Sequence, residues 1–178
     1  MSFFQWIKRR LRRLDKENRR MCVDGGTRIA YDTDAPKEIV SRALVQFSCR
    51  FSSVSLIEKE SSLQCGLYHF SAKKNEDGKG CSVSCGRVAS VRDQQLQTVR
   101  PLSFMDEIER LLRAYNVAQY NGSYYSVSGL PSFFGSSVDA VFESGESVYC
   151  YNNQDPFLPI SLIKELCILF DLDSENRN

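Results

Sequence analysis

The sequence predicts an α+β fold: a mainly antiparallel sheet built from hairpins, packed by two or three helices, with an N-terminal amphipathic helix. Three observations predict it. Apolar and polar residues alternate at several places, glycine-containing turns separate such stretches, and two later stretches repeat apolar residues at helical spacing. A chain of 178 residues, 42% of them hydrophobic, can bury one core. We expect a basic segment over 1–24, a single globular domain over 25–173 and a polar tail over 174–178.

The first twenty residues carry most of the charge asymmetry. They hold eight basic and two acidic residues, a net +6, and the whole chain has a net charge of +1, so the remainder carries −5. Phe3, Phe4, Ile7, Leu11 and Leu14 fall within an arc of about 100° on a helical wheel. This pattern predicts a basic amphipathic helix. It needs a surface to lie on, because an isolated helix of this length is marginal in water.

The globular domain begins with strand patterns. Residues 27–31 and 45–51 alternate in polarity, and the second stretch is the clearest strand pattern in the chain. Residues 64–73 and 80–91 are expected to form a hairpin, because Asn75, Asp77 and Gly78 suit a type I turn followed by a glycine bulge. A long polar connection is expected after this hairpin.

A helix is expected to begin at Ser103, whose hydroxyl can cap it, and to end at Asn121-Gly122. Its polar side offers two pairs four residues apart, Asp106 with Arg110 and Glu109 with Arg113. A stretch rich in glycine, serine and aromatic residues covers 121–137. A second hairpin over 138–151 and a final helix over 159–170 complete the domain.

A zinc site is the first chemistry to weigh, because Cys65, His69, Cys81 and Cys85 share the predicted hairpin. Residues four apart on a strand lie about 13 Å apart, whereas all zinc ligands must lie within roughly 2.0–2.3 Å of one ion. His69 is expected to face Cys85, with the two remaining cysteines at opposite ends. At most two ligands converge, so we predict no metal and no cofactor.

Nucleophilic catalysis would have to use His69, the only histidine, and no G-x-S-x-G motif is present. Asp32 and Asp34 resemble the opening D-x-D of haloacid-dehalogenase-like phosphatases. That family has glycine where Ala35 stands, and the alternating parallel βα pattern it requires is absent, so turn formation explains the pair better. The alternative of an enzyme of unassigned class stays open, with carboxylates in a cleft near the 129–135 loop.

The favoured hypothesis is a non-enzymatic protein-interaction module whose basic N-terminus docks on an anionic membrane surface or a partner. A nucleic-acid binder acting through residues 1–20, and a segment that folds onto its own domain, are the further alternatives. The predicted surface-docking residues are Phe3, Phe4, Trp6, Ile7, Lys8, Arg9, Arg10, Arg12 and Arg13. The predicted partner-binding residues are Tyr124, Tyr125, Leu130, Phe133 and Phe134, since aromatic side chains on glycine-containing loops are common interface anchors.

The location follows from the cysteines and from the N-terminus. The seven cysteines show no framework spacing, and the N-terminal apolar residues are interrupted by basic ones, unlike a secretory signal. We therefore expect reduced thiols that mostly act as small core hydrophobes, in a cytoplasmic protein that is peripheral at the inner membrane face if its N-terminus docks there.

Overall fold

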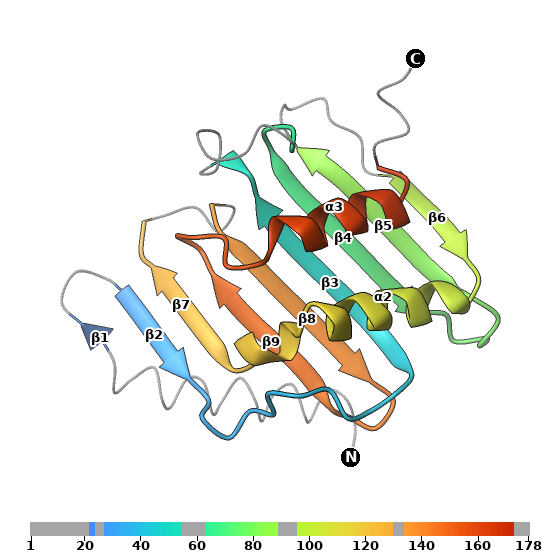
Figure 1. The fold of residues 1–178 in the computed structure, drawn as a ribbon, viewed down its shortest axis with the longest axis horizontal. Helices are drawn as coiled ribbons and strands as arrows, with labels where there is room; N and C mark the ends of the chain where they lie inside the picture. Colours follow the sequence, from blue (N-terminus) through green and yellow to red (C-terminus); the bar gives the residue numbers. More distant parts are fainter. Residues whose placement is uncertain (1–21, 24–26, 55–62, 89–95, 130–133, 173–178) are drawn as a thin grey trace.

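The computed structural model describes residues 22–23, 27–54, 63–88, 96–129 and 134–172. In this part of the chain one nine-stranded sheet forms, in the order β1-β2-β7-β9-β8-β3-β4-β5-β6 (Figure 1). The strands are β1 (Cys22–Val23), β2 (Thr27–Tyr31), β3 (Leu44–Ser52), β4 (Leu67–Lys74), β5 (Cys81–Val88), β6 (Leu96–Arg100), β7 (Ser123–Val127), β8 (Ser136–Phe142) and β9 (Ser147–Asn152). The helices are α2 (Ser103–Ala114), the 3-10 helix η2 (Val117–Tyr120) and α3 (Ile160–Leu169).

The predicted fold class is wrong in its sheet and in its helices. β7 and β9 pair in parallel, with Tyr124 opposite Tyr151, so the sheet is mixed. Among the described residues the sheet is packed by two α-helices and the short η2, and the predicted N-terminal helix lies outside these residues. The parallel pair arises because β9 inserts between β7 and β8, the two strands that precede it along the chain. Two parallel strands cannot be joined by a short hairpin turn, so no turn motif in the sequence marks this pairing.

The centre of the sheet follows the predicted alternation. In β3, Phe47, Cys49 and Phe51 are buried and the residues between them are more exposed. Cys49 lies opposite Phe70 of β4, which is fully buried. Alternate residues of a strand point to opposite faces, so one face of β3, β4 and β5 forms the floor of the core.

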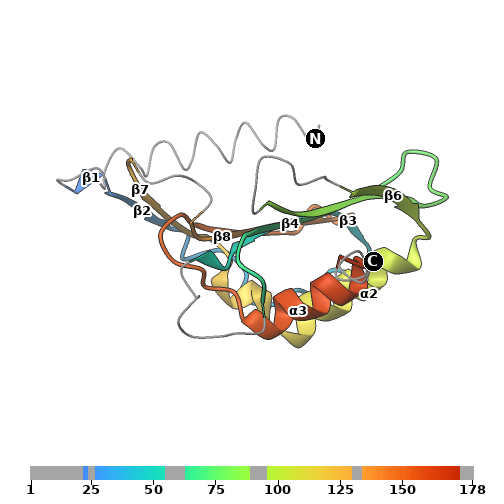
Figure 2. The ribbon, with the colours of Figure 1, turned by 90° about the horizontal axis from the view of Figure 1, so that it is seen from above.

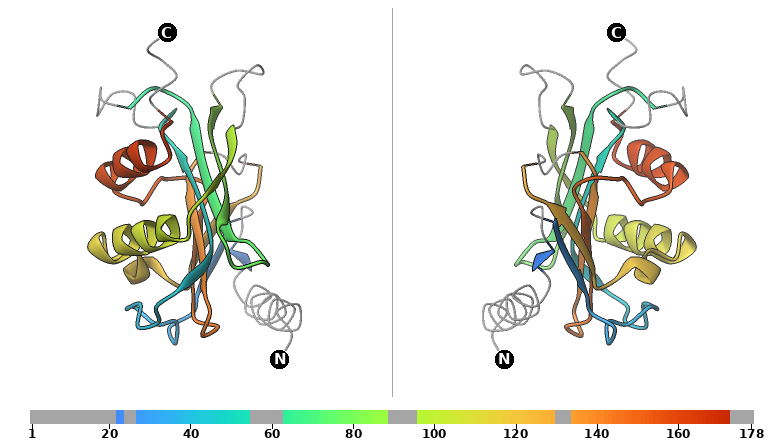
Figure 3. Two further views of the ribbon diagram at one scale, coloured as in Figure 1. Left: turned by 90° about the vertical axis from the view of Figure 1, so that its right-hand side faces the viewer. Right: turned by 90° about the vertical axis from the view of Figure 1, so that its left-hand side faces the viewer.

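Both α-helices lie on the same side of the sheet, as Figures 2 and 3 show. In α2 an apolar stripe that includes Ile108 and Leu112 is buried, and its opposite side is exposed. Phe170, which follows α3, makes edge-on ring contacts at centroid distances of 5.2 Å with Phe70 and 5.0 Å with Phe104. These contacts join the sheet, the start of α2 and the end of α3 into one core.

The ends of α2 differ from the prediction. The N-cap is Leu102, without a side-chain hydrogen bond, so Ser103 does not act as the cap. The helix ends at Ala114, and Asn116 takes a left-handed conformation before η2. Asn tolerates this conformation better than most residues do, so the apolar pattern continues to Tyr120 in a separate turn.

Two polar clusters attach the connection between β2 and β3 to the rest of the domain. Asn121 is buried, and its side-chain amide donates to the carbonyls of Pro36 and Ser147 while accepting from the Tyr149 N–H. Arg113 donates to the carbonyls of residues 39 and 41 and to the carboxylate of Glu109. Each buried group gains a partner, which is the condition for placing polar atoms inside a protein.

Besides β1, which falls in the predicted basic segment over 1–24, two strands were not predicted. β6 falls in the stretch expected to be a polar connection, because its residues are exposed or half-exposed and lack a buried apolar alternation. β7 falls in the aromatic stretch expected to be a loop, and all five of its side chains are half-buried. Both strands are defined by pairing with distant segments, β6 with β5 and β7 with β2 and β9.

Candidate functional site

The face of the sheet opposite α2 and α3 carries mainly small polar side chains. On β3, Ser48 and Arg50 alternate with the core residues and therefore point away from the helices. The pairing registers extend this face across the neighbouring strands. We call it the serine face, and its described members are Ser48, Arg50, His69, Ser71, Lys73, Ser82, Ser84, Gln97, Val99, Tyr124, Ser137, Asp139, Tyr149 and Tyr151.

Three tyrosines gather at the β7–β9 end of the serine face. Tyr124 and Tyr151 stack with ring centroids 5.1 Å apart and an interplanar angle of 21°. Tyr149, two residues from Tyr151 on the same side of β9, has a pKa raised to about 12 by burial, by Tyr124 and by Asp139. All three side chains are half-buried. We call Tyr124, Tyr149 and Tyr151 the tyrosine patch.

Positive charge adjoins the tyrosine patch. Arg50 and Tyr151 both lie opposite Ser137 of β8, from its two sides. Burial and Tyr124 raise the pKa of Tyr151, and the charge of Arg50 acts against them. In the described part of the chain, no hydrogen bond or ion pair joins Arg50 or Lys73 to another residue. Arg50 and Lys73 are therefore two cations of the serine face that no described carboxylate neutralises.

The predicted partner-binding residues do not form one cluster. Tyr124 lies in the tyrosine patch, whereas Tyr125 points to the other side of β7 and lines a depression of about 520 Å³ with Asn152, Gln154 and Asp155. Phe134 is half-buried just before β8. Leu130 and Phe133 lie outside the described residues, as do all nine predicted surface-docking residues.

One serine–histidine pair does form. The hydroxyl of Ser84 and Nε2 of His69 are 3.3 Å apart on the serine face. A general base must accept a proton and become an imidazolium. Burial and the nearby Arg50 both lower the pKa of His69, so this site opposes the charged form. The pair lacks the electrostatics of a hydrolase triad, in which a carboxylate stabilises the imidazolium.

The predicted register of the first hairpin is wrong by one residue. His69 lies opposite Gly86, and Cys85 lies opposite Phe70. The reason is a longer turn, in which the Asn75 N–H donates to the Gly80 carbonyl at 2.9 Å and four residues lie between them. A one-residue shift moves a side chain to the other face.

The shift separates the residues considered for zinc. His69 points to the serine face, while the Cys85 thiol is buried 3.5 Å from the Phe170 carbonyl on the side of the helices. Within the described ranges, no group of three or more His, Cys, Asp or Glu side chains lies close enough to hold a metal ion.

Two carboxylates of the second hairpin, Glu143 and Glu146, serve the fold. Glu143 pairs with Lys74 at 2.5 Å. Glu146 accepts hydrogen bonds from the Val40 and Ser41 main chain, and although burial acts to raise the pKa of Glu146, these bonds and Arg113 hold it below its ordinary value. A depressed pKa marks a carboxylate that is stabilised as an anion, not one poised to transfer protons near neutral pH.

Asp32 and Asp34 lie in a turn, as expected, and a second D-x-D sequence, Asp171 and Asp173, begins at the end of α3. Asp32 Oδ1 accepts the Asp34 N–H at 3.1 Å, which forms a local turn after β2. Asp171 takes a left-handed conformation after α3 and pairs with Arg100. Local structure thus explains Asp32, Asp34 and Asp171, whereas Asp173 lies outside the described residues.

Of the six cysteines that follow Cys22, none forms a disulfide within the described residues and five are buried. This confirms the prediction that most cysteines pack as small hydrophobic residues. Burial raises the pKa of Cys49 and raises that of Cys150 to about 12, which keeps these thiols protonated and unreactive. Cys65 is the exposed member of the described set.

Sequence reasoning missed most of the serine face. Arg50, Tyr149 and Tyr151 were visible as the polar half of alternating strands, but their common face depends on which strands are neighbours.

None of the described helices is long and apolar enough to cross a membrane.

No protein-family model, no curated protein and no solved structure matches this chain.

Proposed function

We propose that the chain is a non-enzymatic protein-interaction module that binds a protein partner through the serine face. The observation that carries the proposal is the tyrosine patch beside Arg50, which forms no ion pair with any residue that the structure describes. Tyrosine and arginine are the residue types enriched at the energetic centres of protein interfaces. The described carboxylates do not converge on a cleft, and Glu146 is committed to main-chain donors, which favours binding over catalysis.

The basic N-terminus completes the proposal. Residues 1–20 would dock the module on an anionic membrane surface or on the partner, with the basic side chains toward the negative charge. The described residues offer no second surface for docking on negative charge. On the serine face Arg50 and Lys73 lie on different strands and do not form a dense basic cluster.

The partner-binding role is tested in two stages. A photo-crosslinking amino acid at Tyr151 should capture a partner in the source cells, while the same residue at the exposed Val40, 81% accessible, should not. The captured protein is then purified, and its affinity is measured for Y124A, Y151A and R50A against V40A. We expect losses of about 30-fold for at least one patch variant, the effect of an interface hot spot. Unchanged affinity in all three patch variants would remove the serine face from the proposal.

The N-terminal role is tested separately on the full chain. Substituting Lys8, Arg9, Arg10, Arg12 and Arg13 with glutamine removes five charges, each contributing on the order of 1 kcal/mol near an anionic membrane. Co-sedimentation with phosphatidylserine vesicles should then fall by at least a hundredfold, a threshold set below the full additive loss. Sedimentation that is equal for both proteins, or binding to an RNA oligonucleotide but not to vesicles, would contradict membrane docking.

A further inference from the structure

β6 is one edge of the sheet. It pairs with β5 over Leu96–Arg100, and it has no strand on its other side in the described part of the chain. Its three central residues are exposed, and Val99 retains 72% of its accessible surface. The outer side of β6 is therefore open to solvent.

The direction of the main-chain groups of β6 follows from the turn between β4 and β5. The Asn75 N–H donates to Gly80, so Gly80 and every second residue after it face β4. Cys81, Val83 and Cys85 then face β6, where they pair with Arg100, Thr98 and Leu96. The N–H and C=O groups of Gln97 and Val99 point outward by the same alternation. Two donors and two acceptors are presented in one row.

This edge lacks the usual protection against strand pairing. Natural edge strands carry charges, prolines or bulges that block addition of another strand. β6 keeps an uninterrupted register along its whole length, and Pro101 follows only after its last residue. Its single charge, Arg100, is paired with Asp171 of the α3 end. The chain maintains a regular, nearly uncharged edge.

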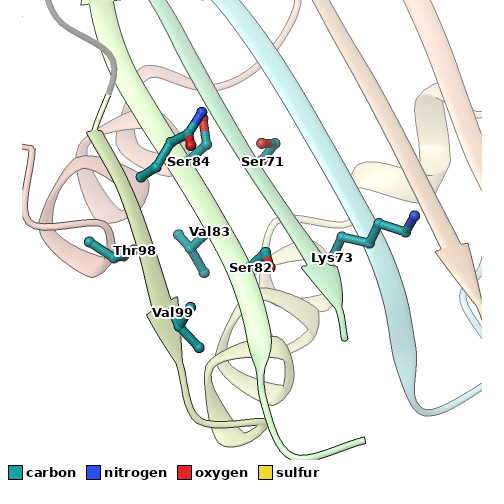
Figure 4. A pocket seen from close by; sticks show the side chains of 8 residues that line it. Ser71, Lys73, Ser82, Val83, Ser84, Thr98 and Val99 are labelled. Carbon is teal, nitrogen blue, oxygen red and sulfur yellow. The ribbon is translucent and has the colours of Figure 1, made fainter. Parts of the chain in front are cut away.

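A depression adjoins this edge on the serine face. It has a volume of about 510 Å³, and it is lined by Ser71, Ser82, Ser84 and Gln97 together with Val99 and Lys73. Figure 4 shows the serine side chains on β4 and β5 beside β6, with the Lys73 chain directed away from Ser71 and Ser84. Hydroxyl and amide groups at such a site can hydrogen-bond a long polar side chain.

We infer that β6 binds an extended segment of a partner protein, which adds to the sheet as a tenth strand. Main-chain bonds to Gln97 and Val99 supply affinity, and alternate side chains of the segment turn toward the serine face, where a long polar one reaches the depression. The inference rests on the proposed protein-interaction function and adds a second contact to it. The tyrosine patch lies on β7 and β9, toward the opposite end of the sheet order, so the two contacts do not overlap.

The size of the sheet argues for a peptide segment and against a second copy of this chain. Twisted open sheets rarely exceed about ten strands without curling or splitting. One added segment brings the nine strands to ten, whereas edge-to-edge pairing of two copies would create a sheet of eighteen. A single extended segment is the occupant that the sheet accommodates.

The test uses V99P, with V99T as the matched control. Proline removes the outward N–H of residue 99 but no bond to β5, a position at which edge strands tolerate proline. Threonine keeps the N–H and the branched side chain. The probe is a phage-displayed library of random linear peptides selected on the full wild-type chain. We expect selected peptides to bind V99P about tenfold or more weakly and V99T unchanged.

Amide hydrogen exchange by NMR on the wild-type chain keeps the inference testable if V99P does not fold. In the free protein the Gln97 and Val99 amides should exchange faster than those of Leu96, Thr98 and Arg100, and a selected peptide should slow the first pair. Equal peptide binding by V99P and V99T, failure to select any peptide, or a wild-type dimer that V99P converts to a monomer would each overturn the inference. If Y151A lowers the affinity for the captured partner and V99P does not, the proposed function stands without β6.

Discussion

Arg113 supports a sharp stability prediction, because a second arginine on the same helix provides its control. Arg113 donates to Glu109 at 2.8 and 3.0 Å and to the main chain of the connection between β2 and β3. The side chain of Glu109 is only 11% accessible and that of Arg113 is 36% accessible. In R113M the Glu109 carboxylate keeps its charge, loses its partner and stays largely out of water.

The magnitude lies between two known limits. Removing one partner of a fully buried pair costs about 3–5 kcal/mol, and an exposed pair contributes about 0–1 kcal/mol. Since Arg113 is one-third exposed, we expect R113M to lose about 2–4 kcal/mol of unfolding free energy. For a chain of this size the melting temperature should fall by roughly 4–16 °C.

Urea unfolding followed by circular dichroism measures this loss. The control is R110M, because Arg110 pairs with Glu107 where both side chains are more than half exposed, and we expect a change of at most about 0.5 kcal/mol. The double variant R113M/E109Q should recover part of the unfolding free energy that R113M loses. The interaction free energy between the two substitutions should be roughly 0.5–3 kcal/mol. If R113M and R110M lose the same unfolding free energy, the loss does not depend on the burial of Glu109 or on the bonds from Arg113 to the 39–41 main chain, and the reasoning is refuted.

Three further predictions concern titration and reactivity. The pKa of Glu146 is lower in the folded state, so its carboxylate stabilises the fold above the unfolded pKa near 4.3, and this contribution is lost as the pH falls through the folded pKa. E146Q should therefore make the unfolding free energy depend less on pH between about pH 5 and 3. An unchanged pH dependence would contradict this prediction. The pKa of His69 is also lowered in the folded state, and R50Q should raise it toward about 6.5. An NMR titration of the single histidine measures this change. An unchanged His69 pKa in R50Q would show that Arg50 does not act on this ring. In a C22S background, iodoacetamide should label Cys65 in the native protein well before any other described thiol, and mass spectrometry after proteolysis would expose a contrary order.

The proposed function depends on a face that the strands form jointly. The tyrosine patch combines one residue of β7 with two of β9, and its cation comes from β3. Tyr124, which the sequence analysis predicts to bind a partner, lies in this patch, whereas Tyr125 beside it points to the other face. The membrane or partner docking of residues 1–20 stays a prediction, since those residues are outside the described part of the chain.

The sequence by itself determined the elements whose pattern is local. The alternation around Phe47 defined β3, the apolar stripe around Ile108 defined α2, and the Asp77-Gly78 turn placed the hairpin of β4 and β5. Each of these patterns repeats within a few residues, because the side chains of one strand or one helix must reach the same core.

Only the tertiary structure decided how these elements meet. The parallel pairing of β7 with β9, the strand character of β6 and the one-residue register of His69 against Gly86 all depend on main-chain hydrogen bonds between segments or on turn length. Those bonds use groups that every residue carries, so they leave little trace in side-chain composition. The open edge at Val99 and the tyrosine patch are consequences of that pairing, and for this reason they emerge from the fold and not from the order of residues alone.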